Sequence, residues 1–360
     1  MSQRRCPRCN KVYGDPARFC PQDGTPLIEV GGGAAPAAPK PAPSAPAART
    51  LVRPAAEPRL PSHDRASNLT NQLLDGRYQV GKKLGEGGMS YVYLARETAT
   101  GETVAIKVLT PKLSGDQSSV ERLRREAGLA MRLDHVNVCR ILRLGETEDG
   151  IIYLVMPYLP GELLSDREVK KGPLPLDVGV PLLVQICHGL QHAHDLHIIH
   201  RDLKPENIML VPEPQGPGGV RAVVMDFGLA KERRAEPEVA KLTATGIVLG
   251  TPEFMSPEQI RGRPLDARSD VYALGILAFE MFTGELPFQG KNAQEMMIAR
   301  LKGKARNLRD VKPEMPQRVE AVLARAMSLE PNDRFPTMTA FAEALNGAEE
   351  SGVFAKLFKR

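Results

Sequence analysis

The pattern of this chain changes from mainly strand-like to mainly helical at Pro160–Gly161, and the change restricts the folds that the chain can adopt. Before it, between residues 78 and 109, short runs rich in β-branched and aromatic residues alternate with glycines and predict antiparallel strands. After it, the apolar stretches 178–195 and 270–282 predict buried helices. We therefore expect an α+β fold in which a small β-rich lobe precedes a larger helical lobe, and ligands often bind between such lobes.

Composition divides the 360 residues into four segments. Residues 1–30 are punctuated by cysteine, proline and glycine and predict a small module. Residues 31–73 begin with an alanine- and proline-rich stretch that buries too little apolar surface to fold, so we expect a disordered, flexible linker. Residues 74–346 have the pattern of a folded domain, and we expect the basic tail 347–360 to be frayed.

Charge and composition argue against several classes of protein. The net charge of +5 is a mild excess for this length, so we expect no nucleic-acid partner. No apolar run reaches the roughly 18 residues that span a bilayer, and no secretory signal is evident, so we expect no transmembrane segment. The five cysteines do not predict a disulfide framework, and we expect a cytoplasmic protein.

A glycine-rich stretch, Gly85–Val92, lies between the first two predicted strands. Glycines let backbone N–H groups approach an anion closely, because no Cβ intervenes. Taken alone, the stretch is equally well explained as an ordinary hairpin turn.

Lys107 lies on the third predicted strand, on the same face as Ala105. An inward-pointing lysine needs a partner that neutralises it. A charged helical pattern follows at 119–133, and Glu126 shares its inward face with Ala130, so we expect a Lys107–Glu126 ion pair.

Two further motifs supply groups for proton transfer and metal binding. His200–Asn207 contains Asp202, and Asp226 begins Asp-Phe-Gly 24 residues later. One carboxylate can accept a proton from an attacking hydroxyl, and a second carboxylate with an asparagine can hold Mg²⁺ through oxygen ligands.

In this order, the motifs resemble those of a protein kinase catalytic domain over residues of about 75–346. The stretches 85–89 and 250–259 resemble the bacterial eukaryotic-like (Hanks-type) kinases most. Lys204, two residues after Asp202, is the pattern of serine/threonine kinases rather than tyrosine kinases. The resemblance implies a two-lobed protein kinase fold and transfer of the γ-phosphate of ATP to serine or threonine hydroxyls of protein substrates.

The resemblance implies roles for the polar residues. Asp202 would orient and deprotonate the substrate hydroxyl, and Lys204 would contact the γ-phosphate. Asn207 and Asp226 would hold Mg²⁺. Lys107, held by Glu126, would contact the α- and β-phosphates of ATP.

The resemblance also implies which residues surround the nucleotide. The residues that would cover the phosphates or enclose adenine are Leu84, Gly85, Glu86, Gly87, Gly88, Met89, Ser90, Val92, Ala105, Met156, Pro157, Tyr158, Leu159 and Met209. Met156 would be the gatekeeper, and 157–159 would form the hinge. Elsewhere, Glu258 would pair with Arg334, and Asp270 would anchor the catalytic loop.

Some positions depart from the family pattern without removing a catalytic group. Ser90 replaces the third glycine of the loop, and Pro157 replaces the usual acidic residue at the hinge. The alternative function is a catalytically idle scaffold that binds nucleotide and recruits partners through the N-terminal module.

Thr243 and Thr245 lie between Asp226 and Glu258, where related kinases autophosphorylate. Arg201 would bind the added phosphate. The alternative is that they are plain loop threonines. Autophosphorylation in trans would require two chains to meet.

Cys6, Cys9, Cys20 and Asp23 form two short knuckles that resemble a zinc ribbon with one cysteine replaced by a carboxylate. Zinc accepts carboxylate oxygen, and so short a segment needs a metal to fold. The alternatives are a metal-free tail or a site completed by a partner chain.

Overall fold

The computed structural model describes residues 3–5, 12–14, 28–29, 63–87, 90–110, 117–227 and 252–357. The chain forms two compact units, Met1–Ala56 and Glu57–Arg360. In the first unit, the described backbone is a three-stranded antiparallel sheet of order β2-β1-β3. Its strands are β1 (Gln3–Arg5), β2 (Val12–Gly14) and β3 (Ile28–Glu29).

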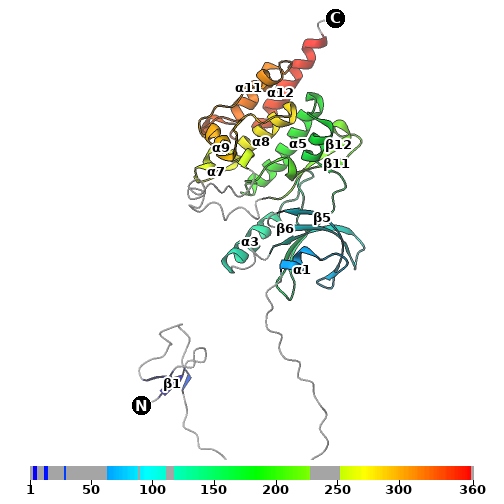
Figure 1. Cartoon of the computed structure of the whole chain (residues 1–360), viewed down its shortest axis with the longest axis vertical. Coiled ribbons are helices and arrows are strands. Elements are labelled where there is room, and N and C mark those ends of the chain that lie inside the picture. The colour runs from blue at the N-terminus through cyan, green and yellow to red at the C-terminus, as the bar shows by residue number, and fades with distance from the viewer. Residues whose placement is uncertain are drawn as a thin grey trace, which may run out of the picture. The chain divides into compact units, whose positions relative to one another are not determined.

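The second unit begins with an antiparallel sheet of order β4-β5-β6-β7-β9-β8, which forms the β-rich lobe (Figure 1). Its strands are β4 (Leu73–Leu74), β5 (Tyr78–Gly87), β6 (Ser90–Glu97), β7 (Thr103–Leu109), β8 (Arg143–Glu146) and β9 (Ile152–Pro157). Side chains alternate between the two faces along β6, and Tyr91 and Tyr93 enter the core of the lobe with Ile106 and Tyr153. The opposite face of β6 and β7 carries Val92, Ala105 and Lys107 and is available for a ligand.

The sequence pattern placed the end of the linker at residue 73 and the start of the folded domain at residue 74. In the structure, the folded unit begins earlier in the chain. Helix α1 (His63–Ser67) precedes β4, and both Ala66 and Leu69 are fully buried in the lobe core. The hydroxyl of Tyr93 donates a 3.0 Å hydrogen bond to the carbonyl oxygen of Ala66. These few apolar residues have no recognisable period, so only the sheet surface on which they pack reveals that they belong to the domain.

Helix α3 (Gln117–Ala130) connects β7 to β8, and beyond β9 the chain enters the helical lobe. The α-helices of this lobe are α4 (Leu164–Lys171), α5 (Leu176–Asp195), α7 (Pro257–Ile260), α8 (Ala267–Thr283), α9 (Ala293–Leu301), α10 (Leu308–Val311), α11 (Gln317–Ala326) and α12 (Met338–Leu357). Every residue of α8 from Ser269 to Phe279 is buried, so this helix forms the centre of the lobe, and α5 and α11 pack against it. No helix within the described ranges is both long and apolar enough to cross a membrane.

A small sheet of order β10-β11-β12 lies at the start of the helical lobe. Its strands are β10 (Glu162–Leu163), β11 (Ile208–Pro212) and β12 (Val220–Val224), and the 3₁₀ turn η1 (Pro205–Asn207) leads into β11. The sheet holds the two catalytic motifs of the sequence together, because the loop from His200 precedes β11 and Asp226 follows β12. Within the described ranges, three more 3₁₀ turns are η2 (Pro217–Gly219), η4 (Pro252–Phe254) and η5 (Pro331–Asp333).

The expected pair between Glu258 and Arg334 is confirmed. Two hydrogen bonds of 2.7 and 2.8 Å join the guanidinium of Arg334 to the two carboxylate oxygens of Glu258. The same guanidinium also donates to backbone carbonyls of Arg268, Ser328 and Leu329. A buried ion pair of this kind is tolerated because protein groups replace the water that both partners lose.

Replacing Gly161 by alanine is expected to destabilise the domain. Its added Cβ would overlap the backbone carbonyl oxygen of Leu210, which β-pairing holds in place. We expect a loss of roughly 1–3 kcal/mol, the usual cost of overpacking, measured by thermal or urea unfolding. The matched control is Gly128→Ala on α3, where a Cβ meets nothing within 4 Å and should stabilise by up to about 1 kcal/mol. Equal stability of the two variants would contradict this prediction.

Candidate active site

The predicted nucleotide-contacting residues of the sheet lie on one face of neighbouring strands. Val92 on β6 is paired with Lys107 on β7, and Ala105 is paired with Met156 on β9. This register confirms that Ala105 and Lys107 share a face. Met156 is half-buried at the end of β9, where the expected gatekeeper belongs.

The remaining predicted nucleotide contacts come from both lobes. Leu84, on β5, is 39% exposed, so it has apolar surface left for a ligand. Met209 lies on β11 of the other lobe and is half-buried. Pro157 ends β9, and the exposed Tyr158 and half-buried Leu159 follow it as the connection between the lobes.

The glycine-rich stretch forms the tip of the β5–β6 hairpin. Gly85 is paired with Val92 and Gly87 with Ser90, and the carboxylate of Glu86 lies 3.0 Å from Lys83 Nζ. The two residues at the tip itself, Gly88 and Met89, lie outside the described residues.

Lys107 is paired with Asp226, whereas the sequence pattern predicted Glu126 as its partner. Lys107 Nζ lies 2.7 Å from Asp226 Oδ1, and the structure gives no ion pair between Lys107 and Glu126, both of which it describes. Glu126 is half-buried on α3, next to the fully buried Ala127. The expectation rested on the inward face of α3, but Asp226 is a second carboxylate that β12 brings to the same lysine.

The Lys107 ammonium also controls the ionisation of Asp226. Burial by itself would raise the pKa of this carboxyl, but the charge and hydrogen bond of Lys107 outweigh burial and hold the pKa below its ordinary value. His200 and Lys204 act in the same direction. Asp226 is therefore ionised near neutral pH, as a metal ligand must be.

Asp202, Lys204 and Asn207 come together on one short loop. Lys204 Nζ lies 3.8 Å from Asp202 Oδ2, and Asn207 Nδ2 donates a 2.7 Å hydrogen bond to the backbone carbonyl oxygen of Asp202. The backbone N–H of Met225 donates to the carbonyl oxygen of Asn207 at 2.8 Å, so this loop is joined to the segment that carries Asp226. The four polar groups predicted for phosphate transfer and metal binding therefore belong to one site.

Asp270 anchors the catalytic loop, as expected. Its two carboxylate oxygens accept hydrogen bonds from the backbone N–H groups of His200 (2.8 Å) and Arg201 (3.0 Å). His194 Nε2 lies 2.7 Å from Asp270 Oδ2. Arg201 has a φ of +63°, a conformation that non-glycine residues seldom adopt, and the Asp270 bonds help to hold the chain in it.

The imidazole of His200 joins the two motifs. It is fully buried, and its Nε2–H donates to the carbonyl oxygen of Met225 at 2.8 Å. Nδ1 accepts a hydrogen bond from the backbone N–H of Asp202 at 3.3 Å. Its edge also contacts the ring of Phe227, with centroids 4.8 Å apart.

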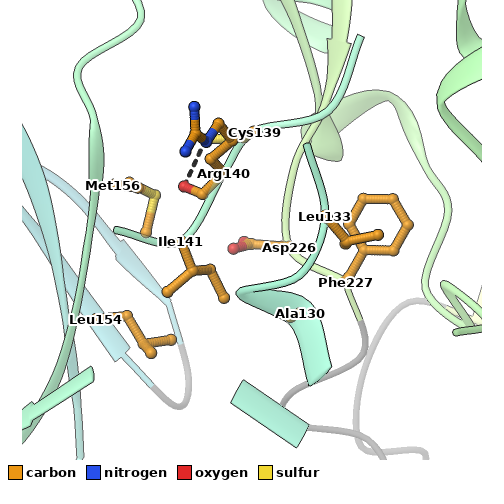
Figure 2. A pocket seen from close by; sticks show the side chains of 9 residues that line it. All are labelled: Ala130, Leu133, Cys139, Arg140, Ile141, Leu154, Met156, Asp226 and Phe227. Atoms are coloured by element: carbon orange, nitrogen blue, oxygen red, sulfur yellow. Dashed lines mark hydrogen bonds between the residues drawn. The ribbon is translucent and has the colours of Figure 1, made fainter. Parts of the chain in front are cut away.

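A small pocket of about 20 Å³ lies beside Met156 and is lined by Met156, Cys139, Asp226 and Phe227 among others. Figure 2 shows the Asp226 carboxylate directed toward the side of Ile141 and Met156, while the Phe227 ring points away from it. Burial raises the pKa of the Cys139 thiol to about 12, so this cysteine is not a nucleophile near neutral pH. Cys187 is fully buried, as expected of a core residue.

Several predicted site residues lie outside the described residues. They are the activation-segment threonines Thr243 and Thr245 and the candidate zinc ligands Cys6, Cys9, Cys20 and Asp23. The described residues contain no cluster of His, Cys, Asp or Glu that could hold a metal through three such side chains.

Sequence reasoning missed an acidic group beside the catalytic loop, made up of Glu168, Glu206, Glu253 and Glu280. These residues come from α4, η1, η4 and α8, so no spacing in the sequence signals them. Burial, and then the neighbouring charge of Glu280, raise the pKa of Glu168 to about 8. Burial and the charges of Glu206 and Glu253 raise the pKa of Glu280 to about 7.

The acidic group should make the domain less stable as the pH rises. The folded pKa values of Glu168 and Glu280 lie above their ordinary 4.5, so the folded chain holds protons that the unfolded chain has released. The contribution of these two carboxyls to the free energy of unfolding is complete below about pH 4.5, where both are protonated in either state. It is lost as the pH rises through their folded pKa values of about 7 and about 8. Glu168→Gln should raise the melting temperature at pH 9 and change it little at pH 5.

Thermal unfolding at both pH values measures this effect. Glu314→Gln, at an exposed position, is the matched control and should change the melting temperature equally little at both. A pH-independent effect of Glu168→Gln would show that Glu168 does not titrate as described.

Comparison with known proteins agrees with this geometry. Residues 78–345 match the family described as "Protein kinase domain". Serine/threonine-protein kinase pkn3 of Myxococcus xanthus is 37% identical over 276 residues, which cover 76% of this chain and 50% of pkn3. Tyrosine-protein kinase MasK of Myxococcus xanthus is 36% identical over 306 residues, which cover 78% of this chain and 46% of MasK.

Solved structures share the fold. The crystal structure of the Mycobacterium tuberculosis PknI kinase domain is 26% identical, with a TM-score of 0.62 and coverage of 79% of this chain and 100% of that domain. The chain spans about half the length of the two curated relatives. Because the family match covers most of the chain and includes the whole site from the glycine-rich stretch to Asp226, the chain belongs to the protein kinase family.

Proposed function

We propose that the chain is a serine/threonine protein kinase that transfers the γ-phosphate of ATP to hydroxyls of protein substrates. The proposal rests on one observation. Hydrogen bonds and ion pairs bring five polar residues together in one site: Asp202, Lys204, Asn207, Asp226 and Lys107. Lys204 beside Asp202 favours serine and threonine as acceptors. The relatives include both serine/threonine- and tyrosine-named kinases, so the acceptor residue is itself part of the test.

In this mechanism the protein contributes positioning and charge. Asp202 orients the acceptor hydroxyl and takes its proton, and its position is fixed by backbone bonds to His200 and through Asn207. Lys204, 3.8 Å from Asp202, stabilises the negative charge of the phosphoryl group during transfer. Lys107, whose Nζ lies 2.7 Å from Asp226 Oδ1, would contact the α- and β-phosphates of ATP.

The residues present fit a magnesium ion. The amide nitrogen of Asn207 is committed to the Asp202 carbonyl, which leaves its Oδ1 as a ligand atom, and Asp226 is held ionised. Both are hard oxygen donors of the kind that Mg²⁺ prefers. Bound there, the ion would neutralise phosphate charge.

We further propose that Thr243 and Thr245 are autophosphorylated. Arg201, directly before Asp202 in the sequence, would bind the added phosphate and order the segment. Such a reaction in trans requires two chains to meet. Because the enzyme consumes ATP, we expect its kinase domain to work in the cytoplasm.

The test of the kinase function is phosphate transfer from labelled ATP and Mg²⁺ to the chain itself and to a generic basic protein. Asp202→Asn should lower turnover by roughly 10²–10⁴-fold, because it removes the proton acceptor. Lys107→Met should also abolish transfer. Phosphoamino-acid analysis should detect phosphoserine or phosphothreonine, and peptide mapping should locate Thr243 or Thr245.

The control for this test is Asp166→Asn, which changes an exposed carboxylate on α4 outside the site. It should leave transfer unchanged. A wild-type chain that binds ATP but transfers no phosphate, even with Thr243 and Thr245 changed to Glu, would refute the kinase function and favour the idle scaffold.

For the N-terminal module we propose a structural zinc ion bound by Cys6, Cys9, Cys20 and Asp23. The three short strands β1 to β3 are the described backbone around these positions, and a module of this size needs a metal to fold. We infer that the module recruits partner proteins for the kinase.

Elemental analysis of the full chain should find one zinc per chain. The ion should be lost in Cys6→Ser, because removing one thiolate leaves an incomplete ligand set. Cys187→Ser, which changes a cysteine of the kinase core, should retain the metal. A metal-free wild-type preparation whose N-terminal module is folded would contradict the proposal.

A further inference from the structure

Arg300 is a buried cation outside the catalytic site. It lies near the end of α9, and its side chain is 0% exposed. Burial lowers its pKa, while Tyr272 and Glu253 act in the opposite direction. An arginine remains charged even so, and burying its charge is costly unless protein groups replace the lost water. Its contacts therefore show what the buried charge holds in place.

The guanidinium of Arg300 bridges two loops. Its Nη2 donates a hydrogen bond to the backbone carbonyl oxygen of Glu253 in η4. Its Cζ lies 5.6 Å from the centre of the Phe288 ring, which belongs to the connection between α8 and α9. The hydrogen bond to a backbone atom depends on the position of the Glu253 main chain rather than on the identity of its side chain.

Phe288 continues these contacts into the core. Its ring is stacked on Tyr272 of α8, with centroids 6.3 Å apart and planes at 21°, and the Cζ of Arg334 lies 4.7 Å from the Tyr272 ring centre. The Tyr272 hydroxyl is buried and has no hydrogen-bond partner among the described residues, so the ring acts through stacking. We call Arg300, Phe288, Tyr272 and Arg334 the arginine–aromatic stack.

The two ends of the arginine–aromatic stack hold the two ends of one short segment. Arg300 binds the carbonyl oxygen of Glu253, and Arg334 binds the carboxylate of Glu258. Gln259, the next residue, donates a 2.8 Å hydrogen bond from Nε2 to the carbonyl oxygen of Arg201, directly before Asp202. Helix α9 packs against both η4 and α7, and Figure 1 shows α9 beside α7. Together with the Gln259 bond, this packing holds the segment beside the catalytic loop.

We propose that Arg300 is a positioning residue for the protein substrate, because it holds the segment 253–259 against the catalytic loop. The inference rests on the proposed kinase function. Because Gln259 of this segment is bonded to Arg201, directly before Asp202, a protein chain that places its hydroxyl at Asp202 lies near the segment. The predicted ATP contacts instead lie mainly on β5 to β9. Loss of Arg300 therefore weakens use of the protein substrate and leaves use of ATP unchanged.

The test uses the full chain and compares Arg300→Met and Arg300→Lys with wild type. The readouts are the KM for a generic basic protein substrate, the KM for ATP, and ATP hydrolysis to water without protein substrate. Arg300→Met should raise the protein-substrate KM roughly tenfold, because the segment 253–259, no longer held by Arg300, must be ordered when the substrate binds. The KM for ATP and the hydrolysis rate should stay within about twofold, and Arg300→Lys should restore part of the protein-substrate KM.

The control is Arg325→Met. Arg325 lies on α11, and its Cζ is 4.3 Å from the centre of the Phe335 ring, so it makes the same kind of contact with an aromatic ring. It should leave all three readouts unchanged. If Arg300→Met does not fold, as judged by thermal unfolding, Phe288→Leu and Arg300→Lys provide the same comparison.

Two results would overturn the inference. One is an unchanged protein-substrate KM, and the other is a parallel loss of both KM values and of hydrolysis, which indicates a merely structural role. A wild-type chain that transfers no phosphate would instead refute the kinase function, so the two failures are distinguishable.

Discussion

The carboxylate of Asp270 is the group on which the geometry of the site depends. It is 1% exposed, on the central helix of the helical lobe, and accepts the backbone N–H groups of both residues before Asp202. Burial by itself would raise the pKa of Asp270, but hydrogen bonds from His194 and the backbone and the nearby imidazoles hold it below its ordinary value. An ionised carboxylate in the core thus keeps a loop in a backbone conformation that it would not adopt alone.

From this anchor, hydrogen bonds and ion pairs extend to the groups that we assign to phosphate transfer. His200 connects Asp202 to the carbonyl of Met225, and Asn207 connects the same loop to the segment with Asp226. Asp226 then reaches across to Lys107 in the β-rich lobe. The catalytic groups are positioned mainly by backbone bonds, which explains how a loop with little regular structure can be precise enough for catalysis.

A second network holds the segment that we propose borders the protein substrate. The arginine–aromatic stack and the Glu258 ion pair hold residues 253–258 from two sides, and Gln259 joins that segment to the catalytic loop. Both networks start from α8, through Asp270 and Tyr272, so one buried helix positions both the catalytic loop and the adjoining segment. The interior of the helical lobe therefore positions the groups to which we assign phosphate transfer.

The sequence alone determined the two-lobed α+β fold and the polar residues of the site, because strand and helix periods and the order of motifs are local properties. It also predicted the Glu258–Arg334 pair and the Asp270 anchor, through the resemblance. Only the tertiary structure decided that Lys107 pairs with Asp226, that Ala66 and Leu69 belong to the folded domain, and that four glutamates and the arginine–aromatic stack assemble. The physical reason is that a local pattern shows which face of an element is apolar, whereas ion pairs and stacking depend on which distant elements meet.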